Sequence, residues 1–328
     1  MRRPLVLVPL FVMSIIVFAS YAAAQEMTPH HHLESNAMSA DASANVESVQ
    51  DWAKQRLVKS PRHQEWVKVK NGNREVNSFV VYPEVKNKAT AVVVIHEIFG
   101  MSDWVQELTD ELAEAGYIAI APDLLSGMGA NGGGSSSFDN TGVRQAINNL
   151  PPDQITADLN AVADYVSKLP AANGKVVVAG FCWGGRQTFR FVTNRPTLKA
   201  AFVFYGDAPM TGPQGSQTVD KDALGRINAP VYGFYAGNDA RINATLPATG
   251  DAMTELKKKY DPVIYEGAGH GFMRAGEAPE PGRPELKGDK DADDKATEAY
   301  VNAMIAYKAN RKARDEAWER WKKLLGRI

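Results

Sequence analysis

The residues with the clearest chemical potential surround the single cysteine of this 328-residue chain. Residues 175–185 read K-V-V-V-A-G-F-C-W-G-G, so an apolar run enters Gly180-x-Cys182-x-Gly184 and a helical pattern follows at once. A nucleophile on such a strand-to-helix turn projects from a strained backbone, and glycines without a Cβ let neighbouring segments approach closely. The N-terminus of the following helix favours a thiolate. The pattern predicts Cys182 as a nucleophile; the alternative is a buried structural cysteine in a glycine-rich turn.

A thiol nucleophile needs a base, because little thiolate exists at neutral pH. Among the six histidines, His270 lies in a glycine-rich segment after the last expected strand, where it can reach the turn around Cys182. Asp239 follows another strand and is the expected acid that orients the histidine. Asp207, which also follows a strand, is the alternative acid. The order Cys182, Asp239, His270 is the order of nucleophile, acid and base in α/β-hydrolases.

The oxyanion of an acyl-transfer intermediate needs two N–H donors. The segment 92–100 reads V-V-V-I-H-E-I-F-G, a strand that ends in a loop before a helix. In this arrangement that loop supplies one donor and the residue after the nucleophile supplies the other, so we expect the amides of Ile98 and Trp183 to form the oxyanion hole. His96 and Glu97 do not form a zinc motif, because no histidine follows Glu97 by three residues.

Strand-like and helical segments alternate through most of the chain. Short, continuous runs rich in Val, Ile, Phe and Tyr are typical of strands buried on both faces. The expected strands are Trp66–Val69, Phe79–Tyr82, Ala91–His96, Ile118–Pro122, Val176–Ala179, Ala201–Tyr205, Val231–Ala236 and Val263–Tyr265. The expected helices cover about 104–115, 153–168, 184–194, 248–259 and 291–324. This alternation predicts an α/β fold with a mostly parallel sheet flanked by helices, and the first two strands should form an antiparallel edge because no helix fits between them.

Three segments depart from the alternation. Residues 126–137 form a Gly- and Ser-rich loop, which we interpret either as a lid over a pocket or as a flexible insertion. Residues 277–293 are rich in Pro, Glu, Lys and Asp and are typical of a solvated linker. The final helix carries Trp318, Trp321 and Leu325, which we expect to pack on their own domain; a partner or membrane surface is the alternative.

The N-terminus predicts export. Arg2 and Arg3 precede an apolar stretch from Leu5 to Phe18 and small residues around Ala24, the pattern of a secretory signal peptide at 1–24. The apolar stretch is shorter than the ~20 residues of a spanning helix, so an uncleaved anchor is the lesser alternative. A poorly ordered or partly helical extension is expected at 25–60, with the hydrolase-like domain at 61–328. His30, His31 and His32 lie in the extension, as a weak metal site or, in the preferred interpretation, as part of a solvated tail.

Composition excludes several classes of protein. The formal net charge is −1 and the pI about 6.6, without the basic excess of a nucleic-acid binder. A lone cysteine cannot make an internal disulfide, and there is no cysteine cluster for zinc or iron–sulfur. We therefore expect no metal, no cofactor and no nucleic-acid partner. A monomeric, periplasmic or secreted protein without stable membrane insertion after signal cleavage is the prediction.

Taken together, these motifs resemble the dienelactone hydrolase (carboxymethylenebutenolidase) family, over about residues 65–310. The matching segments are His96-Glu-Ile-Phe-Gly, Ala121-Pro-Asp-Leu, Gly180-Phe-Cys-Trp-Gly-Gly, Gly237-Asn-Asp and Gly267-Ala-Gly-His-Gly-Phe-Met-Arg274. The resemblance implies an α/β-hydrolase fold with an eight-stranded sheet and a triad of Cys182, Asp239 and His270.

The resemblance also implies roles for three charged residues. Glu97 would contact the thiol and help to form the thiolate once substrate binds, and Arg274 would hold a substrate carboxylate. Arg144 is a weaker equivalent of a second family arginine, because no motif anchors its alignment.

The expected activity is hydrolysis of a small ester or lactone, dienelactone-like and anionic, through a thioester acyl-enzyme. A broad-specificity esterase, an acyltransferase or a peptidase on the same scaffold are alternatives, and a non-catalytic binding protein is a further one. The export signal, the extension, the Gly-rich loop, the long final helix and Trp183 after the nucleophile depart from compact family members, so the substrate itself stays open.

Overall fold

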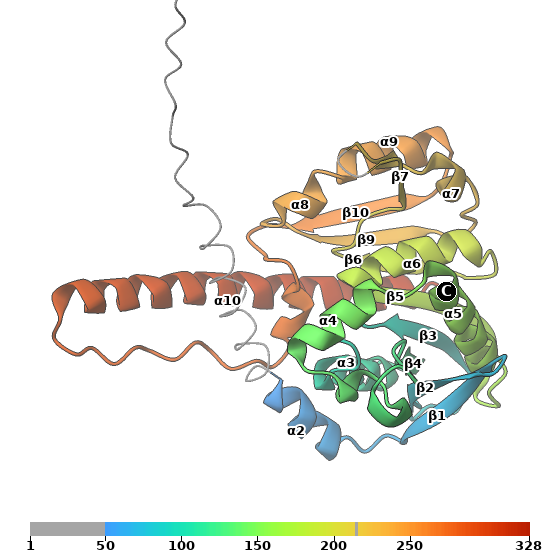
Figure 1. Ribbon diagram of the computed structural model, residues 1–328, viewed down its shortest axis with the longest axis horizontal. Helices are drawn as coiled ribbons and strands as arrows, with labels where there is room; N and C mark the ends of the chain where they lie inside the picture. Colours follow the sequence, from blue (N-terminus) through green and yellow to red (C-terminus); the bar gives the residue numbers. More distant parts are fainter. Residues whose placement is uncertain (1–49, 214–215) are drawn as a thin grey trace, which may run out of the picture. The chain divides into compact units, whose positions relative to one another are not determined.

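The computed structural model describes residues 50–213 and 216–328, all within one compact unit (Figure 1). The predicted signal peptide, the start of the predicted extension and His30, His31 and His32 lie outside the described residues. Those predictions therefore stay predictions.

An eight-stranded sheet organises the chain, with neighbours in the order β1-β2-β4-β3-β5-β6-β9-β10. β1 pairs antiparallel with β2 and β2 antiparallel with β4, whereas every later pairing is parallel. The mostly parallel sheet with an antiparallel edge, predicted from the apolar runs, is confirmed. Its strands are β1 Gln64–Asn71, β2 Arg74–Val81, β3 Ala89–Ile95, β4 Ile118–Pro122, β5 Ala172–Phe181, β6 Ala201–Phe204, β9 Val231–Ala236 and β10 Tyr260–Tyr265.

Helices cover both faces of the sheet (Figure 1). All seven residues of β3 are buried, and Val92 and Val94 belong to one apolar cluster while Val93 and Ile95 belong to the other. This alternation follows from the two-residue period of a strand. One cluster includes side chains of α5 (Pro152–Ser167), α6 (Trp183–Asn194) and α9 (Leu246–Glu255); the other includes those of α3 (Asp103–Glu114) and α10 (Lys290–Leu325).

The observed elements differ from the expected ones at helix ends and at short helices that begin at a capping residue. Helix α9 ends at Glu255 rather than near 259, because Lys257 takes a φ of +54° and the chain turns into β10. Asp139 and Asp220 each accept a backbone N–H and so start helices too short to show a clear apolar period. Helix α2 Asp51–Lys59 lies in the extension that was expected to be partly helical. The elements not anticipated are α4 Asn140–Asn148, α7 Lys221–Gly225, α8 Ala240–Asn243 and the pair β7 Met210–Thr211 with β8 Thr218–Val219.

The Gly-rich segment 126–137 is fastened to the end of β4. The carboxylate of Asp123 accepts hydrogen bonds from the Ser135 amide at 2.7 Å and from the Ser135 hydroxyl at 2.6 Å. A Cβ at Gly134 would lie 2.1 Å from that carboxylate, so the residue must be glycine for the loop to approach. The loop also packs against the segment after β3, since a Cβ at Gly100 would lie 2.3 Å from the Ser135 hydroxyl oxygen.

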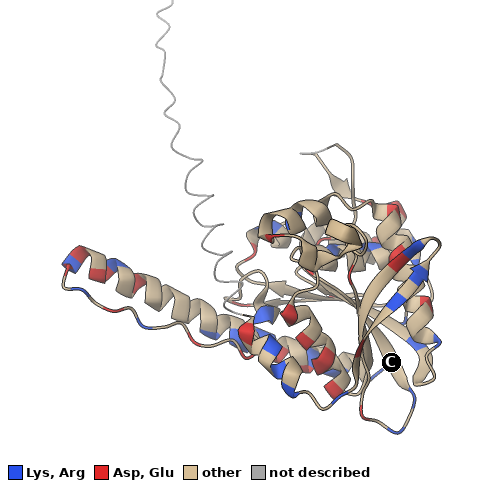
Figure 2. Cartoon of the chain, turned by 60° about the horizontal axis from the view of Figure 1, so that its bottom comes forward, with Lys and Arg blue, Asp and Glu red and all other residues tan. Residues whose placement is uncertain are grey.

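Helix α10 is buried only in its C-terminal third, where Trp318 and Trp321 lie within the apolar cluster beneath the sheet. Toward its N-terminus Val301 and Ile305 are exposed, and the colours of Figure 2 show acidic and basic residues mixed at that end. Among the described helices, none is both long and apolar enough to cross a membrane.

Candidate active site

Cys182 occupies the turn between β5 and α6. Its φ of 55° and ψ of −116° lie in a region that residues with a side chain rarely adopt. The amide of Cys182 donates to the carbonyl of Phe204 at 3.1 Å, and its carbonyl accepts the amide of Arg186 at 3.2 Å. These bonds tie the strained residue to β6 on one side and to the first turn of α6 on the other.

The glycines around Cys182 make this turn possible. A Cβ at Gly180 would lie 2.2 Å from the carbonyl oxygen of Gly184, and one at Gly184 would lie 2.4 Å from the carbonyl oxygen of His96. Both distances are far below van der Waals contact, so helix α6 can approach β5 and β3 only with glycine at these positions. The physical reason inferred from the sequence motif is thus present in the structure.

His270 and Asp239 lie together beside this turn. The imidazole Nδ1 of His270 is 2.5 Å from Asp239 Oδ2, and the Asp239 carboxylate is buried while it caps α8 by accepting the Ile242 amide. A carboxylate at Nδ1 fixes the tautomer in which that nitrogen carries the proton. The other ring nitrogen then remains for Cys182, whose side chain contributes to raising the pKa of His270.

The charges of this group stabilise an imidazolium. Burial alone would lower the pKa of His270, but hydrogen bonds with Asp239 and Cys182 and the charges of both raise it to about 9. Burial would raise the pKa of Asp239, but the hydrogen bond and charge of His270 lower it. At neutral pH the pair is therefore an aspartate beside a histidine that readily holds a second proton.

Two amides point to an oxyanion site. Ile98 lies in the loop after β3, and Trp183 is the first residue of α6, where helix amides have no internal acceptor. Neither amide donates a hydrogen bond within residues 50–213 and 216–328. Both remain available to stabilise a developing negative charge.

His96 packs beside these two residues. Its ring is fully buried, stacks on Trp183 with centroids 5.6 Å apart, and lies with Nδ1 2.8 Å from the Glu97 carbonyl oxygen. The Leu124 amide donates to Nε2 at 3.4 Å. Burial lowers the pKa of His96, so the ring is neutral and donates from Nδ1. His96 is thus a structural residue of the site.

Glu97 and Arg274 form a buried ion pair. Glu97 is 1% exposed, and its Oε2 lies 2.7 Å from Nη1 of Arg274, which belongs to the 3₁₀ turn Phe272–Ala275. The second oxygen of Glu97, Oε1, has no hydrogen-bond partner among the described residues. The guanidinium therefore neutralises Glu97 while one carboxylate oxygen stays free to accept a proton.

Several known proteins resemble this chain over most of its length. The sequence profile of the dienelactone hydrolase family matches residues 76–328. A curated relative from Salmonella typhi, provisionally named carboxymethylenebutenolidase, is 31% identical over 206 residues, which are 60% of this chain and 73% of the relative. A relative from Saccharolobus solfataricus with the same provisional name is 28% identical over 287 residues, 77% of this chain and 95% of the relative.

The chain belongs to the dienelactone hydrolase family. A solved structure from Klebsiella pneumoniae is provisionally described as a dienelactone hydrolase. It has a TM-score of 0.58 at 24% identity and covers 75% of this chain and 98% of its own. An acylaminoacyl peptidase from Pyrococcus horikoshii has a TM-score of 0.51 at 16% identity, over 76% of this chain and 43% of its own. These likenesses confirm the α/β-hydrolase fold. The family makes this protein a carboxylic ester hydrolase.

The structure separates the two acids that the sequence left open. Asp207 receives two hydrogen bonds of 2.8 Å from the guanidinium of Arg186. Asp239, not Asp207, contacts His270. Arg186 on α6 thus binds the alternative acid, Asp207, and the spacing of residues in the sequence could not reveal this.

The weaker arginine candidate also lies at this site in the dienelactone hydrolase fold. The guanidinium carbon of Arg144, from α4, is 4.9 Å from the centroid of the Phe99 ring, and that of Arg274 is 5.3 Å from the same centroid. Both cations therefore flank one aromatic ring in the loop that carries Ile98. Within the described part of the chain, no group of three or more His, Cys, Asp or Glu side chains is placed to hold a metal ion.

Tyr205 is a site residue that sequence reasoning missed. It is fully buried, takes a φ of +40°, and its ring meets His270 edge-on with centroids 5.0 Å apart. Burial, followed by the negative charge of Glu97, raises the pKa of Tyr205 well above its ordinary value. The only sequence signal was its place in Phe204-Tyr-Gly-Asp207, a segment in which the aspartate is the more obvious candidate.

Proposed function

We propose that this protein hydrolyses a small, carboxylate-bearing ester or lactone through Cys182 as nucleophile. The observation that carries the proposal is the strained Cys182 next to the hydrogen-bonded His270–Asp239 pair. A backbone conformation of this cost persists where the surrounding fold holds a functional side chain. A thiol, an imidazole and an orienting carboxylate in this relation are the parts of a nucleophilic triad.

The acylation step follows from these contacts. The Cys182 proton passes to His270, whose imidazolium is stabilised by Asp239, and the thiolate attacks the ester carbonyl carbon. The carbonyl oxygen becomes an oxyanion that accepts hydrogen bonds from Ile98 and Trp183. As the tetrahedral intermediate collapses, the C–O bond to the alcohol breaks, His270 returns its proton to the leaving oxygen, and a Cys182 thioester remains.

Deacylation reverses the roles. Neutral His270 takes a proton from water as the water oxygen attacks the thioester carbonyl, and the same two amides stabilise the second oxyanion. As this intermediate collapses, the C–S bond breaks, the carboxylic acid is released, and His270 returns its proton to the sulfur of Cys182. Each step uses a proton acceptor or donor already present among the described residues.

Arg274 is the reason for proposing an anionic substrate. Its guanidinium contacts Glu97, and Arg144 lies near the same Phe99 ring as Arg274 does. A substrate carboxylate that binds Arg274 would compete with Glu97 for the guanidinium. Glu97 would then become a second acceptor for the Cys182 proton, in the role that the family resemblance gives it.

The nucleophile is tested with 4-nitrophenyl acetate and a dienelactone, comparing wild type with Cys182→Ala. We expect turnover by wild type and a loss of at least about 10³-fold in the variant, because no other residue at the turn can form the acyl-enzyme. Equal hydrolysis by both proteins would assign the activity to another group. A thioester trapped on residue 182 by rapid acid quench and mass spectrometry separates nucleophilic from general-base catalysis.

The charge preference is tested with mono(4-nitrophenyl) succinate and its neutral methyl ester. Arg274→Ala should lower the ratio of kcat/KM for the acid over the methyl ester by roughly 10- to 100-fold, because it removes a charge-assisted hydrogen bond. Arg274→Lys, which keeps the cation, should retain part of the preference. The ratio cancels any general damage caused by leaving Glu97 unpaired. An unchanged ratio in Arg274→Ala would show that the substrate need not be anionic.

Export and a monomeric state complete the proposal. They rest on the signal-peptide pattern of residues 1–24 and on the ordinary composition of the chain. N-terminal sequencing of protein recovered from cell fractions tests cleavage after Ala24, and light scattering on the purified protein tests the mass. Retention of Met1 in the cytoplasmic fraction, or a mass of two chains, would contradict the respective part.

A further inference from the structure

A cavity of about 590 Å³ lies beside the proposed triad, on the side of His270. His270, Gly271 and Arg274 form the wall nearest the chemistry. The opposite wall comes from distant parts of the chain, Trp52 of α2 and Tyr307 of α10. The volume lies in the usual range of small-molecule sites.

The walls away from His270 and Arg274 are more apolar than polar, although Gln50, Glu280 and Asn310 also line them. The apolar part includes Trp104, Ala278, Pro279, Ala303 and Ala306, together with the ring of Trp52. Such a surface gains free energy by excluding water from an apolar ligand, and indole rings prefer flat, aromatic groups.

Trp52 is held in place by the loop that follows Arg274. A Cβ at Gly276 would lie 2.2 Å from the Trp52 ring, so only glycine leaves room for the indole at this point. Tyr307 donates its hydroxyl proton to the carbonyl of Ala278 at 3.2 Å, and Arg311 donates to that of Gly276 at 2.5 Å. The loop is thereby fastened to α10 and forms a fixed side of the cavity.

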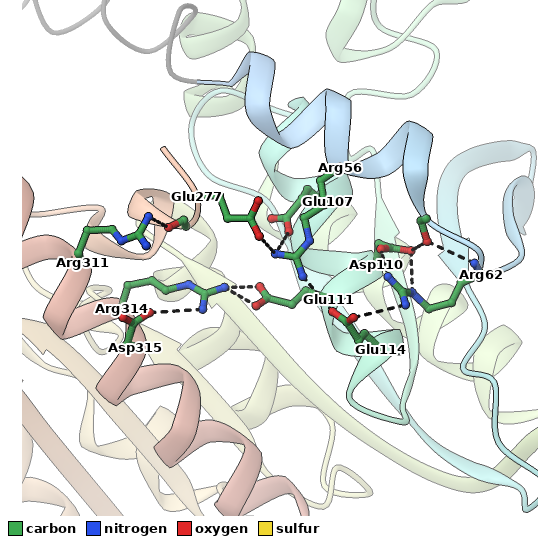
Figure 3. A network of polar contacts seen from close by, with 12 residues as sticks. Arg56, Arg62, Glu107, Asp110, Glu111, Glu114, Glu277, Arg311, Arg314 and Asp315 are labelled. Carbon is green, nitrogen blue, oxygen red and sulfur yellow. Dashed lines mark hydrogen bonds and ion pairs between the residues drawn. The ribbon is translucent and has the colours of Figure 1, made fainter. Parts of the chain in front are cut away.

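Helix α2 is fastened independently by a network of ion pairs (Figure 3). Arg56 of α2 lies 3.3 Å from Glu107 and 2.9 Å from Glu114, both on α3, and 3.2 Å from Glu277 in the loop. Arg62, which follows α2, binds the buried carboxylate of Asp110 at 2.5 Å. Because Asp110 is buried, separating α2 and the residues after it from α3 would leave its carboxylate without the Arg62 partner.

Helix α2 precedes residues 76–328, the part that matches the family. Trp52 thus lies outside the matched residues and nonetheless lines a cavity that His270 also lines. A large aromatic side chain in the wall of that cavity changes what the site can accept.

We propose that this cavity binds the alcohol portion of the ester, that this portion is aromatic, and that Trp52 determines this specificity. The inference rests on the proposed function, because it takes His270 as the group that protonates the leaving oxygen. A leaving group must lie near the residue that protonates it, and His270 lines this cavity. The acyl portion, with its carboxylate, lies toward Glu97 and Phe99.

The test compares mono(2-naphthyl) succinate with monophenyl succinate, which differ only in the size of the aromatic alcohol. Wild type should prefer the naphthyl ester by about tenfold or more in kcat/KM, since each added apolar group in a fitted pocket is worth at least this much. Trp52→Ala should reduce the ratio to roughly 1–3. Trp66→Ala removes a tryptophan that is 51% exposed on β1, and as a matched control it should keep the wild-type ratio.

A second variant fills the cavity without touching α2. Ala306 is exposed on α10 and lines the cavity, so Ala306→Phe should block the naphthyl group and reduce the ratio as Trp52→Ala does. A naphthyl preference that survives in both variants would overturn the inference, as would a wild type that shows no preference.

Binding of 2-naphthol, measured by calorimetry, separates the inference from the proposed function. Wild type and Trp66→Ala should bind it about tenfold more tightly than Trp52→Ala and Ala306→Phe do, whether or not any ester is hydrolysed. Equal binding by all four proteins, or no binding by wild type, would overturn the inference. Hydrolysis that does not depend on Cys182 would instead overturn the proposed function and leave this binding result to stand by itself.

Discussion

His270 shows how a single residue acquires its chemistry from its neighbours. Asp239 fixes the Nδ1 proton, Cys182 contributes to the pKa of the ring, and the ring of Tyr205 meets the imidazole edge-on. The pKa is raised although the ring is partly buried, because the interactions with Asp239 and Cys182 outweigh the loss of hydration. The proposed step, which places a second proton on this ring, therefore starts from a site that already favours it.

At this scale we predict that His270 titrates near pH 9 and that Asp239→Asn moves its pKa down toward 6.5. The folded-state pKa is raised, so the charged ring stabilises the fold fully below about pH 6.5, and this contribution is lost as the pH rises through about 9. Imidazole NMR signals give the titration, and urea unfolding at both pH values gives the stability change. A histidine that titrates near 6.5 in both proteins would contradict the assignment of its partners.

Helix α6 and strand β5 meet at a distance that only glycine permits. Gly184→Ala would place a Cβ 2.4 Å from the carbonyl oxygens of Ile95 and His96. We predict a loss of roughly 2–4 kcal/mol in the free energy of unfolding and a larger loss of esterase activity, because α6 must move and takes the Trp183 amide with it. Urea unfolding measures the first effect.

Gly250→Ala is the matched control for this prediction. Gly250 lies in helix α9 with nothing within 4 Å of the added Cβ, so the substitution should be neutral or stabilise by up to about 1 kcal/mol. If both variants lost similar stability, the close approach of α6 would not be the cause.

Helix α10 positions the loop that carries His270. The Gly269 amide donates to the side-chain oxygen of Asn310 at 2.8 Å, immediately before the histidine. Asn310→Ala should lower kcat by about tenfold with little change in KM, because the imidazole loses its fixed position rather than a substrate contact. Asn310→Asp keeps an acceptor oxygen and should restore most of the rate. Asn302→Ala, on the exposed part of α10, should behave like wild type; a similar defect there would mean that α10 acts only through general stability.

At the scale of the whole molecule, the C-terminal part of helix α10 packs into the core next to the residue before the nucleophile. Trp321 is fully buried, with its ring centroid 4.9 Å from that of Phe204 and 6.0 Å from that of Phe181, the residue before Cys182. Helix α10 is therefore part of the cooperative unit that holds β5 and β6 in place, although much of its N-terminal part is exposed.

We predict that Trp321→Ala lowers the free energy of unfolding by about 3–5 kcal/mol, the usual cost of removing a large buried ring. Trp66→Ala, an exposed position, should cost less than about 1 kcal/mol. Chemical unfolding followed by circular dichroism measures both. Comparable losses would show that the C-terminal helix contributes little to the core.

The sequence by itself determined the parts of this protein that depend on local pattern. Apolar runs separated by helical periods gave the parallel sheet and its antiparallel edge, because burial on both faces selects continuous apolar strands. The spacing Gly180-x-Cys182-x-Gly184 between a strand and a helix located the turn, because the close approach of α6 allows no Cβ at the glycines. The family followed from several such motifs in order.

Only the tertiary structure decided which side chains meet. It placed Asp239 on His270 and Asp207 on Arg186, paired Glu97 with Arg274, and set Arg144 and Arg274 near the ring of Phe99. It also put Tyr205 against the histidine and Trp52 in the wall of the adjacent cavity. The contact between Glu97 and Arg274 alone joins residues 177 positions apart in the sequence. They depend on the packing of whole helices and loops, which no local spacing encodes.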